Sequence, residues 1–261
     1  MLDVEGRGVH SGAPCRVTLH RVDGPVRFRR GGREIEATVD AIVDSRRATT
    51  LGADGARVAM VEHLLAALAI RGLWSGVLIE ASADELPILD GSARAWYDLA
   101  GELTEPPPTP TPLRPTAPLQ LTVGDARAEL VPGAAQLCYG IRYDHPAIGE
   151  QRWCGSPDGY PDLVDARTFG LLAEGRALRE RGLAAGADLG NVIVYDEEGP
   201  LVPLRAENEP VRHKALDAVG DLFLLGRPLD ARVAFWRGSH AVHAAFMRDL
   251  LRIDSTTVPR S

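Results

Sequence analysis

Apolar residues alternate with polar ones in several short runs of the chain and recur every three to four positions in others. The first pattern is typical of strands and the second of amphipathic helices. We expect strands over residues 15–22, 76–80, 119–123, 127–131, 136–144, 191–196 and 231–236, and a hairpin over 26–39 that turns at Gly31 and Gly32. We expect helices over residues 60–70, 92–103, 161–182, 210–226 and 239–251. Because strands precede helices in both halves, the pattern predicts two α+β domains with helices laid on mostly antiparallel sheets.

A proline-rich segment divides the two halves. Residues 105–119 read EPPPTPTPLRPTAPL and hold seven of the 19 prolines. Such a segment favours extended backbone and supports neither a helix nor a central strand. We therefore expect an N-terminal domain over 1–104, a stiff linker over 105–118 and a C-terminal domain over 119–261.

Composition excludes several classes of protein. The net charge of -7 argues against a general nucleic-acid binder, which needs basic groups to neutralise phosphates. The N-terminus lacks an apolar signal region and no run approaches the roughly 18 apolar residues of a spanning helix, so a cytoplasmic protein is expected. Cys15, Cys138 and Cys154 are odd in number and contain no CxxC, which argues against a disulfide framework or a thiolate zinc site. Each is expected to be a buried or inert thiol.

The segment PVRHKALDAVGD, residues 210–221, carries the first candidate chemistry. His213 and Asp217 stand four residues apart on one helix face, and Asp221 lies one turn further on. An imidazole and a carboxylate at this spacing suit a zinc ion, with Asp221 placed to orient another group. The same spacing is also that of an ordinary surface His–Asp pair, so these residues leave both interpretations open.

Two further histidines stand in informative places. Glu62 and His63 begin an otherwise apolar helix, where a charged group is costly unless it has a partner. His63 is therefore either a core histidine bonded to backbone or a third metal ligand beside a carboxylate base. His240 lies at the start of the last expected helix, where it is either solvated or an acid acting near neutral pH. His20, His145 and His243 offer no comparable signal.

Several motifs together point to one family. GRGVHSG, VEHLLAALA, LPILDGSA, ARTFG, VRHKALDAVGDLFLLG and RGSHA occur in an order and spacing that resemble UDP-3-O-acyl-N-acetylglucosamine deacetylases over about residues 6–251. The resemblance implies a Zn²⁺-dependent hydrolase that removes the N-acetyl group of UDP-3-O-acyl-N-acetylglucosamine, the committed step of lipid A biosynthesis. It also implies an α+β fold of two domains of similar topology, with helices sandwiched between two mostly antiparallel sheets.

The resemblance implies roles for matched positions. The implied zinc ligands are His63, His213 and Asp217, and the implied catalytic groups are Glu62 as general base, His240, Asp221 as its support, and Thr168 as an oxyanion donor. The implied substrate-binding residues are Lys214, Phe169, His10 and Arg237, together with an apolar acyl passage in an insert over about 170–205 that includes Leu172, Leu183, Leu189 and Val192. Whether Glu62 or His240 protonates the leaving amine stays open.

Other functions remain compatible with these residues. One is a related zinc deacetylase acting on another N-acyl sugar nucleotide, and another is a zinc-containing binding protein without turnover. The third is a structural protein without metal. The expected partner is a small-molecule substrate, with no nucleic acid and no stable membrane span, and the expected state is a monomer.

Overall fold

The computed structural model describes residues 2–104 and 107–257 of the chain. Glu105 and Pro106, which begin the expected linker, lie outside the described residues. No helix in the described ranges is long and apolar enough to cross a membrane.

The N-terminal part of the chain forms a five-stranded sheet in the order β1-β2-β8-β3-β4. Its strands are β1 (Leu2–Arg7), β2 (Pro14–Pro25), β3 (Arg27–Arg30), β4 (Arg33–Glu36) and β8 (Ser75–Ala81). β8 pairs antiparallel with β2 and parallel with β3. The predicted hairpin is confirmed: β3 and β4 pair around Gly31 and Gly32, whose φ values of +58° and +76° suit glycine.

The C-terminal part repeats this arrangement in the order β9-β10-β15-β11-β12. Its strands are β9 (Leu119–Val123), β10 (Ala126–Pro132), β11 (Gln136–Arg142), β12 (Glu150–Gly155) and β15 (Ala231–Trp236). β15, the last strand in sequence, pairs antiparallel with β10 and parallel with β11. In each sheet, the strand that comes last in the sequence is inserted between the second and the third strand. All other neighbouring strands of the two sheets pair antiparallel. The expected α+β fold with two units of similar topology is confirmed.

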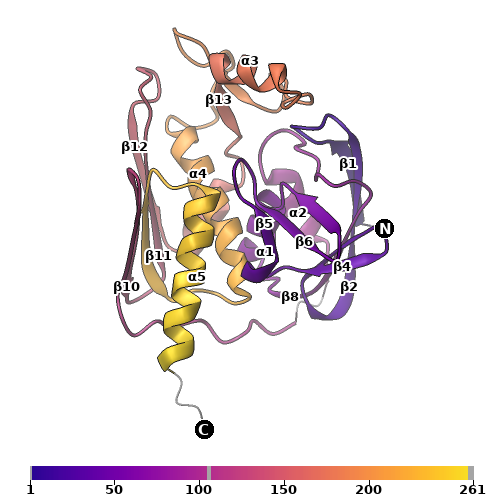
Figure 1. Cartoon of the computed structure of the whole chain (residues 1–261), viewed down its shortest axis with the longest axis vertical. Coiled ribbons are helices and arrows are strands. Elements are labelled where there is room, and N and C mark those ends of the chain that lie inside the picture. The colour runs from indigo at the N-terminus through magenta and orange to yellow at the C-terminus, as the bar shows by residue number, and fades with distance from the viewer. Residues whose placement is uncertain (1, 105–106, 258–261) are drawn as a thin grey trace.

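Helices fill the space between the two sheets (Figure 1). They are α1 (Glu62–Ile70), α2 (Arg94–Gly101), α4 (Glu209–Leu222), which runs into the 3-10 helix η3 (Phe223–Leu225), and α5 (His240–Thr257). Leu64 in α1 and Leu216 in α4 are fully buried in one continuous core that draws on both sheets. Burying apolar faces of both sheets on the same helices gives the sandwich its stability.

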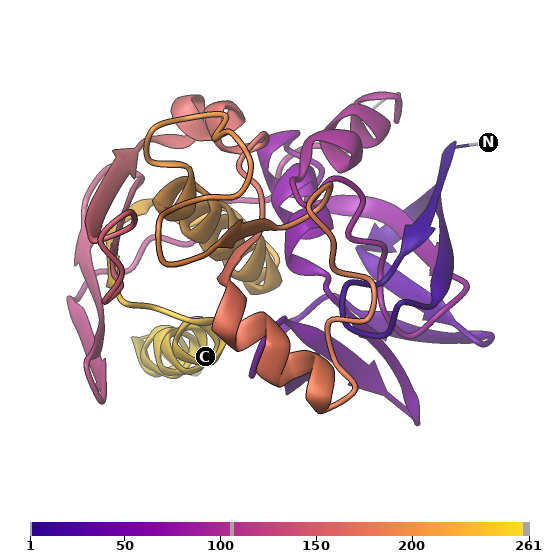
Figure 2. The ribbon, with the colours of Figure 1, turned by 90° about the horizontal axis from the view of Figure 1, so that it is seen from above.

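Two smaller insertions extend from this core. The first contains the 3-10 helix η1 (Val39–Ala41) and a three-stranded sheet of β5 (Ile42–Asp44), β6 (Thr50–Ala53) and β7 (Ala56–Ala59). The second pairs β13 (Phe169–Leu171) in parallel with β14 (Ile193–Tyr195), joined through α3 (Leu172–Glu180). Figure 2 shows α3 lying across the region between the two large sheets.

The continuous helix expected over 161–182 is wrong. The chain there forms the 3-10 helix η2 (Pro157–Leu163), then an irregular stretch, and only then β13 and α3. Thr168 N–H donates to the Gly91 carbonyl and Ile193 N–H donates to the Thr168 carbonyl. These long-range backbone bonds replace the local ones of a helix, so tertiary contacts override the helical pattern.

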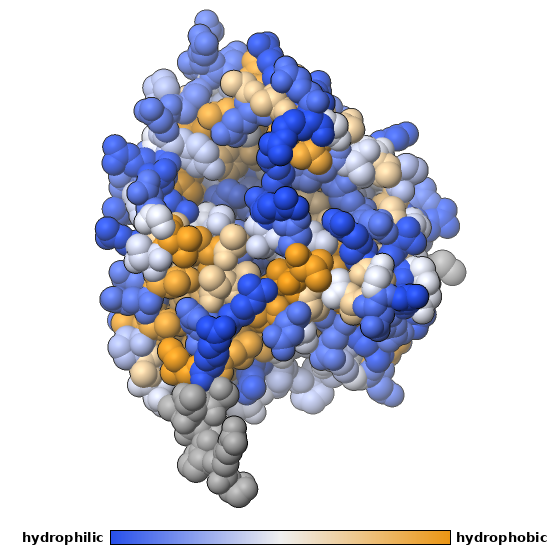
Figure 3. Space-filling view, viewed as in Figure 1, coloured by the Kyte–Doolittle hydropathy of each residue, from blue (hydrophilic) through white to orange (hydrophobic). Residues whose placement is uncertain are grey.

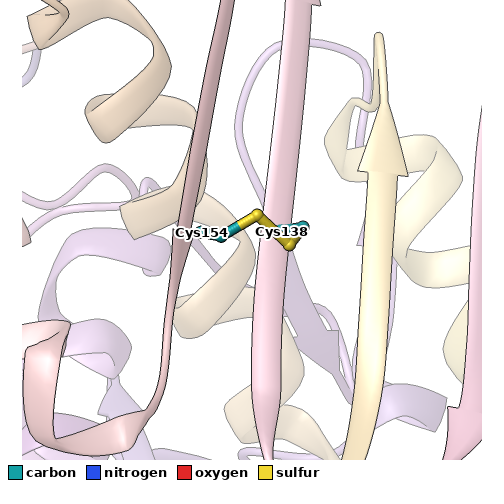
Figure 4. Close-up of a disulfide and its surroundings, with 2 residues drawn as sticks. All are labelled: Cys138 and Cys154. Carbon is teal, nitrogen blue, oxygen red and sulfur yellow. A yellow bond between two sulfur atoms is a disulfide. The ribbon is translucent and has the colours of Figure 1, made fainter.

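The expectation that every cysteine is a free thiol is also wrong. Cys138 in β11 and Cys154 in β12 form a disulfide (Figure 4). Cys15 is a free buried thiol. The two cysteines stand opposite each other in the antiparallel register, with Cα atoms 4.1 Å apart. The sequence separation of 16 gave no sign of this pairing, because β12 was not among the predicted strands.

The described part of the proline-rich segment packs on the C-terminal half. Leu113 is buried, its N–H donates to the Pro228 carbonyl, and its carbonyl accepts from Asp230 N–H. We propose domain boundaries at 1–104 and 119–261, with residues 105–118 as the connector between them.

On the face shown in Figure 3, hydrophobic residues gather over and beside α5 within a mostly hydrophilic surface.

Candidate active site

Glu62 and His63 lie at the start of α1, directly after a sharp turn. Met60 adopts a left-handed φ of +63°, which is uncommon for a residue with a side chain, and Val61 then caps the helix. Both Glu62 and His63 are buried. The turn therefore brings two polar side chains into the layer between the sheets.

α4 crosses α1 at very close range. A Cβ atom on Gly220 would lie 2.0 Å from the Glu62 carbonyl oxygen, so only a glycine fits at this contact. The crossing places the polar stripe of α4 against the first turn of α1. His213, Asp217 and Asp221 are consequently buried, not exposed as a surface stripe would be.

His63, His213 and Asp217 form one cluster. The Oδ1 atom of Asp217 is 3.6 Å from His63 Nε2 and 3.4 Å from His213 Nε2, and the two imidazole rings stand edge to face. This oxygen is buried with no hydrogen-bond partner among the described residues. A buried, orphaned carboxylate oxygen facing two imidazole nitrogens is unfavourable unless a cation lies between them. The three side chains could thus hold a metal ion, and two nitrogens with one oxygen suit zinc.

The protonation of the cluster agrees with metal binding. His213 Nδ1 lies 3.2 Å from the Ala166 carbonyl, which leaves Nε2 free toward Asp217. Burial lowers the pKa of His213 to about 3, so the imidazole is neutral. Burial alone would raise the pKa of Asp217, but the charged Lys214 ammonium holds it well below its usual range. Neutral imidazole and ionised carboxylate are the forms that ligate metals.

Glu62 lies beside this cluster. Its Oε2 accepts a hydrogen bond from Thr49 N–H at 3.0 Å, and its Oε1 is 3.7 Å from His240 Nε2. Burial raises the pKa of Glu62, although the neighbouring charge of His240 opposes the shift. A carboxylate with a raised pKa is a stronger proton acceptor than an exposed one.

His240 is held by Asp221. Its Nδ1 lies 2.8 Å from Asp221 Oδ2, and the Thr49 hydroxyl donates to the other carboxylate oxygen. Burial alone would lower the pKa of His240, but Asp221 and Glu62 raise it to about 9. Burial likewise would raise the pKa of Asp221, but His240 lowers it to about 2. At neutral pH the pair is a charged imidazolium and carboxylate.

A cleft of about 590 Å³ joins these groups to the second insertion. One end is lined by Glu62, His63, His213, Asp217 and His240. The other end is apolar, lined by side chains of α3 and of the chain that follows it, including Leu172, Leu178, Leu189, Val192 and Leu201. A polar end continuous with an apolar end suits a ligand with one reactive group and one hydrocarbon chain.

Most of the substrate-binding candidates border this cleft. His10, Thr168, Phe169 and Lys214 line it, and Lys214 Nζ donates to Asp217 Oδ2 at 3.0 Å. Burial would lower the pKa of Lys214, but Asp217 raises it above its usual value. The Thr168 hydroxyl donates to the Gly91 carbonyl at 3.1 Å, so it has to rotate before it can donate to a ligand.

Two candidates lie elsewhere. Leu183 lines an adjoining cleft of about 850 Å³, which has His10, Arg46 and Arg47 in common with the first. Arg237 is partly exposed and pairs with Asp125, with a nitrogen–oxygen distance of 3.3 Å. The resemblance implied that both contact the substrate, but neither lines the cleft that holds the His63, His213 and Asp217 cluster.

Sequence reasoning missed three residues of the buried network. Thr49 contacts both Glu62 and Asp221, His243 Nδ1 lies 2.7 Å from Asp221 Oδ2, and Tyr139 Oη lies 3.2 Å from His243 Nε2. The signal for His243 was its position one turn beyond His240 on the same helix face. Thr49, directly before β6, and Tyr139, in β11, carried no pattern that marks them as functional residues.

Comparisons with known proteins agree with this geometry. Residues 1–252 match the family model LpxC, described as UDP-3-O-acyl N-acetylglycosamine deacetylase. The chain is 35% identical over 264 residues to the UDP-3-O-acyl-N-acetylglucosamine deacetylase of Wolinella succinogenes, covering 96% of this chain and 88% of the relative. It is 38% identical over 256 residues to the protein of that name from Thermosynechococcus vestitus, covering 93% and 89%. A third relative of that name, from Nitratiruptor sp., is 37% identical over 92% of this chain and 84% of its own length.

Proposed function

The chain belongs to the family of UDP-3-O-acyl N-acetylglycosamine deacetylases, and from this premise we propose that it hydrolyses the acetamido group of UDP-3-O-acyl-N-acetylglucosamine. The products are acetate and the free amine of the UDP-3-O-acyl-glucosamine. The observation that carries the proposal is the cleft, because its buried His, Asp and Glu side chains lie at one end and an apolar wall lies at the other. In this assignment the reaction is the committed step of lipid A biosynthesis.

The proposed metal is zinc, held by His63, His213 and Asp217. The family is one of metalloenzymes, and the orphaned Oδ1 of Asp217 between two Nε2 atoms supports this ligand set. When bound, zinc acts as a Lewis acid that polarises the amide carbonyl and makes water easier to deprotonate. Lys214, through its hydrogen bond to Oδ2, keeps the Asp217 carboxylate ionised and oriented.

Glu62 and His240 are the proposed proton-transfer groups. Glu62 accepts a proton from the attacking water as the new carbon–oxygen bond forms. The protonated His240 donates a hydrogen bond to the carbonyl oxygen as negative charge develops there, an effect of roughly 3 kcal/mol per donor in comparable sites. The carbon–nitrogen bond then breaks, and the nitrogen takes a proton from Glu62 or His240, whose side chains lie 3.7 Å apart.

The sugar nucleotide is proposed to bind with its acyl chain along the apolar end of the cleft. Leu172, Leu189 and Val192 form part of that wall, and Phe169 lies between it and the polar end. Phe169 packs edge to face on His213, so it marks where the chain leaves the reacting group. Thr168, once its hydroxyl has rotated from the Gly91 carbonyl, is proposed to donate to the developing oxyanion, and His10 and Lys214 are proposed to contact the polar part of the substrate. The enzyme is proposed to act as a cytoplasmic monomer.

A comparison of substrates tests this assignment. Each buried methylene contributes about 0.8 kcal/mol, or roughly fourfold in kcat/KM, so activity should rise steeply with the length of the 3-O-acyl chain. UDP-N-acetylglucosamine without an acyl chain should be a very poor substrate. Equal kcat/KM for acylated and unacylated sugars would refute the acyl assignment and favour another N-acyl sugar nucleotide.

A further inference from the structure

We propose that His243 and Tyr139 are positioning residues that lock the Asp221 carboxylate, so that His240 keeps its Nε2 directed into the cleft. Neither residue lines the cleft, and both act through Asp221. The expected effect on kcat rests on the proposed function. The protonation state of His243, in contrast, is measurable without substrate.

Asp221 is held from three sides. Its Oδ2 lies 2.8 Å from His240 Nδ1 and 2.7 Å from His243 Nδ1, and its Oδ1 accepts from the Thr49 hydroxyl. Asp221 and His243 are each only 1% exposed. A buried carboxylate cannot rotate away from one donor without leaving that donor unsatisfied, which costs about 1–3 kcal/mol. His243 thus removes the freedom that Asp221 would have if it served His240 alone.

Tyr139 fixes which nitrogen of His243 carries the proton. Tyr139 Oη lies 3.2 Å from His243 Nε2, and burial raises the pKa of the Tyr139 hydroxyl well above its usual value, so it stays protonated. Its O–H donates to Nε2, which places the proton of neutral His243 on Nδ1. Nδ1 is the atom that faces Asp221, so the tautomer favours donation to the carboxylate. The chain of bonds therefore runs Tyr139, His243, Asp221, His240.

Gly238 gives this pair its space. A Cβ atom at this position would lie 2.6 Å from Tyr139 Oη and 3.1 Å from His243 Nε2. Gly238 stands two residues before His240, in the loop that leads into α5. The need for a glycine here follows from the Tyr139–His243 bond, because any larger residue would push the two groups apart.

The same three groups could alternatively hold a second metal ion. Asp221, His240 and His243 are close enough for that. However, both Nδ1–Oδ2 separations are those of direct charge-assisted hydrogen bonds, which leave no room for an ion between the atoms. The proposal therefore predicts a metal content no higher than that of the His63–His213–Asp217 site alone.

Three variants test the proposal. His243→Ala should lower kcat on the order of 10-fold to 100-fold, as is typical when an outer hydrogen-bond partner in a metal site is lost, with KM and metal content unchanged. His243→Asn should recover much of the lost kcat, because the amide nitrogen can take the place of Nδ1 and donate to Asp221. Tyr139→Phe should lower kcat less, since it removes only the hydroxyl that sets the tautomer.

The closing measurement is a ¹⁵N NMR spectrum of the histidines in the metal-loaded wild-type protein and in Tyr139→Phe. His243 should be neutral with its proton on Nδ1 in the wild type, and this preference should weaken in the variant. A wild-type His243 protonated on Nε2 would overturn the proposal, as would unchanged kcat in a folded His243→Ala protein. No recovery in a folded His243→Asn protein, or a second metal ion per chain, would also overturn it. The spectrum needs no turnover, so a failure of the proposed function leaves it readable.

Discussion

Glu62 and His240 are buried within 3.7 Å of each other, and their pKa values are both raised, but for different physical reasons. Burial raises the pKa of Glu62. Burial alone would lower the pKa of His240, but the carboxylates of Asp221 and Glu62 raise it to about 9. One residue is therefore prepared to accept a proton and the other to remain cationic. Such opposed assignments at close range are a common property of acid–base sites.

At this scale we predict the effect of Glu62→Gln. The glutamine oxygen can still accept the Thr49 N–H, so the fold and the metal content should be retained. Because the amide cannot accept a proton from water, kcat should fall by about 10²–10⁴-fold. Steady-state kinetics and metal analysis check this result.

Glu174→Gln is the matched control for that variant. Glu174 lines the same cleft from α3 but is exposed to solvent, and its kcat should stay close to wild type. Equal losses in both variants would indicate that Glu62 has no special role in proton transfer.

At the scale of elements, the crossing of α1 and α4 assembles the site. Gly220 lets α4 approach the Glu62 carbonyl, and this approach sets the distance between His63 on one helix and Asp217 on the other. The site therefore depends on a backbone contact as much as on its polar side chains. A glycine inside a helix weakens that helix slightly, and here the closer packing compensates.

We predict that Gly220→Ala destabilises the protein and lowers its activity. The added methyl group forces the helices apart, a form of overpacking that typically costs about 1–3 kcal/mol. Metal affinity should fall as well, because the ligands come from both helices. Urea unfolding and metal titration measure the two effects.

Gly159→Ala provides the comparison for Gly220→Ala. A Cβ atom on Gly159 would meet nothing within 4 Å, so the free energy of unfolding should change by less than about 0.5 kcal/mol. A Gly220→Ala protein as stable and as active as this control would contradict the role given to the crossing.

The elements also show how far sequence patterns predict this fold. Strands β9 and β15 were predicted at their observed bounds, since their alternation reflects one buried face. β1, β12 and the β5–β7 sheet were missed. Neither β1 nor β12 contains a fully buried residue, so the apolar signal of each strand is weak. The helical period over 161–182 misled because Arg167 and Thr168 there bond to distant residues.

The site was predictable only where its residues share one helix. His213 and Asp217 share one helix, so their spacing was visible in the sequence. His63 joins them only through the crossing of α1 and α4. Its place at the start of an apolar helix raised it as one alternative, and the resemblance of the motifs then favoured it as a ligand. The positions of Arg237 and Leu183 outside the cleft depend on loops whose paths no periodicity encodes.

At the scale of the whole molecule, a buried ion pair ties the second insertion to α4. Glu209 is fully buried and accepts hydrogen bonds from Arg167 Nε at 2.8 Å, from Arg167 N–H, and from Arg205 N–H. Burial alone would raise the pKa of Glu209, but these bonds hold it below its ordinary 4.5. The pair connects the start of β13 to the first turn of α4, the helix that carries His213.

The Arg167–Glu209 ion pair should make the stability of the protein depend on pH. A carboxyl group whose pKa is lower in the folded state stabilises the protein above its unfolded pKa, and this contribution is lost as pH falls through the folded pKa. Wild type should therefore lose stability below about pH 4.5. Glu209→Gln should be less stable than wild type by about 3–5 kcal/mol at pH 7, because it leaves Arg167 buried without its partner.

Urea unfolding at pH 7 and at pH 3.5 checks whether protonation of Glu209 is coupled to unfolding. The difference in unfolding free energy between wild type and Glu209→Gln should shrink at the lower pH, where the wild-type carboxyl begins to protonate. A difference that stays constant over this range would show that Glu209 does not titrate with the folding equilibrium.

The central claim is that one buried His–His–Asp cluster binds zinc and supports deacetylation of an acylated sugar nucleotide. The most direct measurement is the zinc content of the purified protein together with acetate release from UDP-3-O-acyl-N-acetylglucosamine, before and after removal of metal by a chelator. We expect about one zinc ion per chain, with acetate release that stops on chelation and returns when zinc is restored. Acetate release that persists in the metal-free protein, or a zinc-loaded protein that releases none, would contradict it.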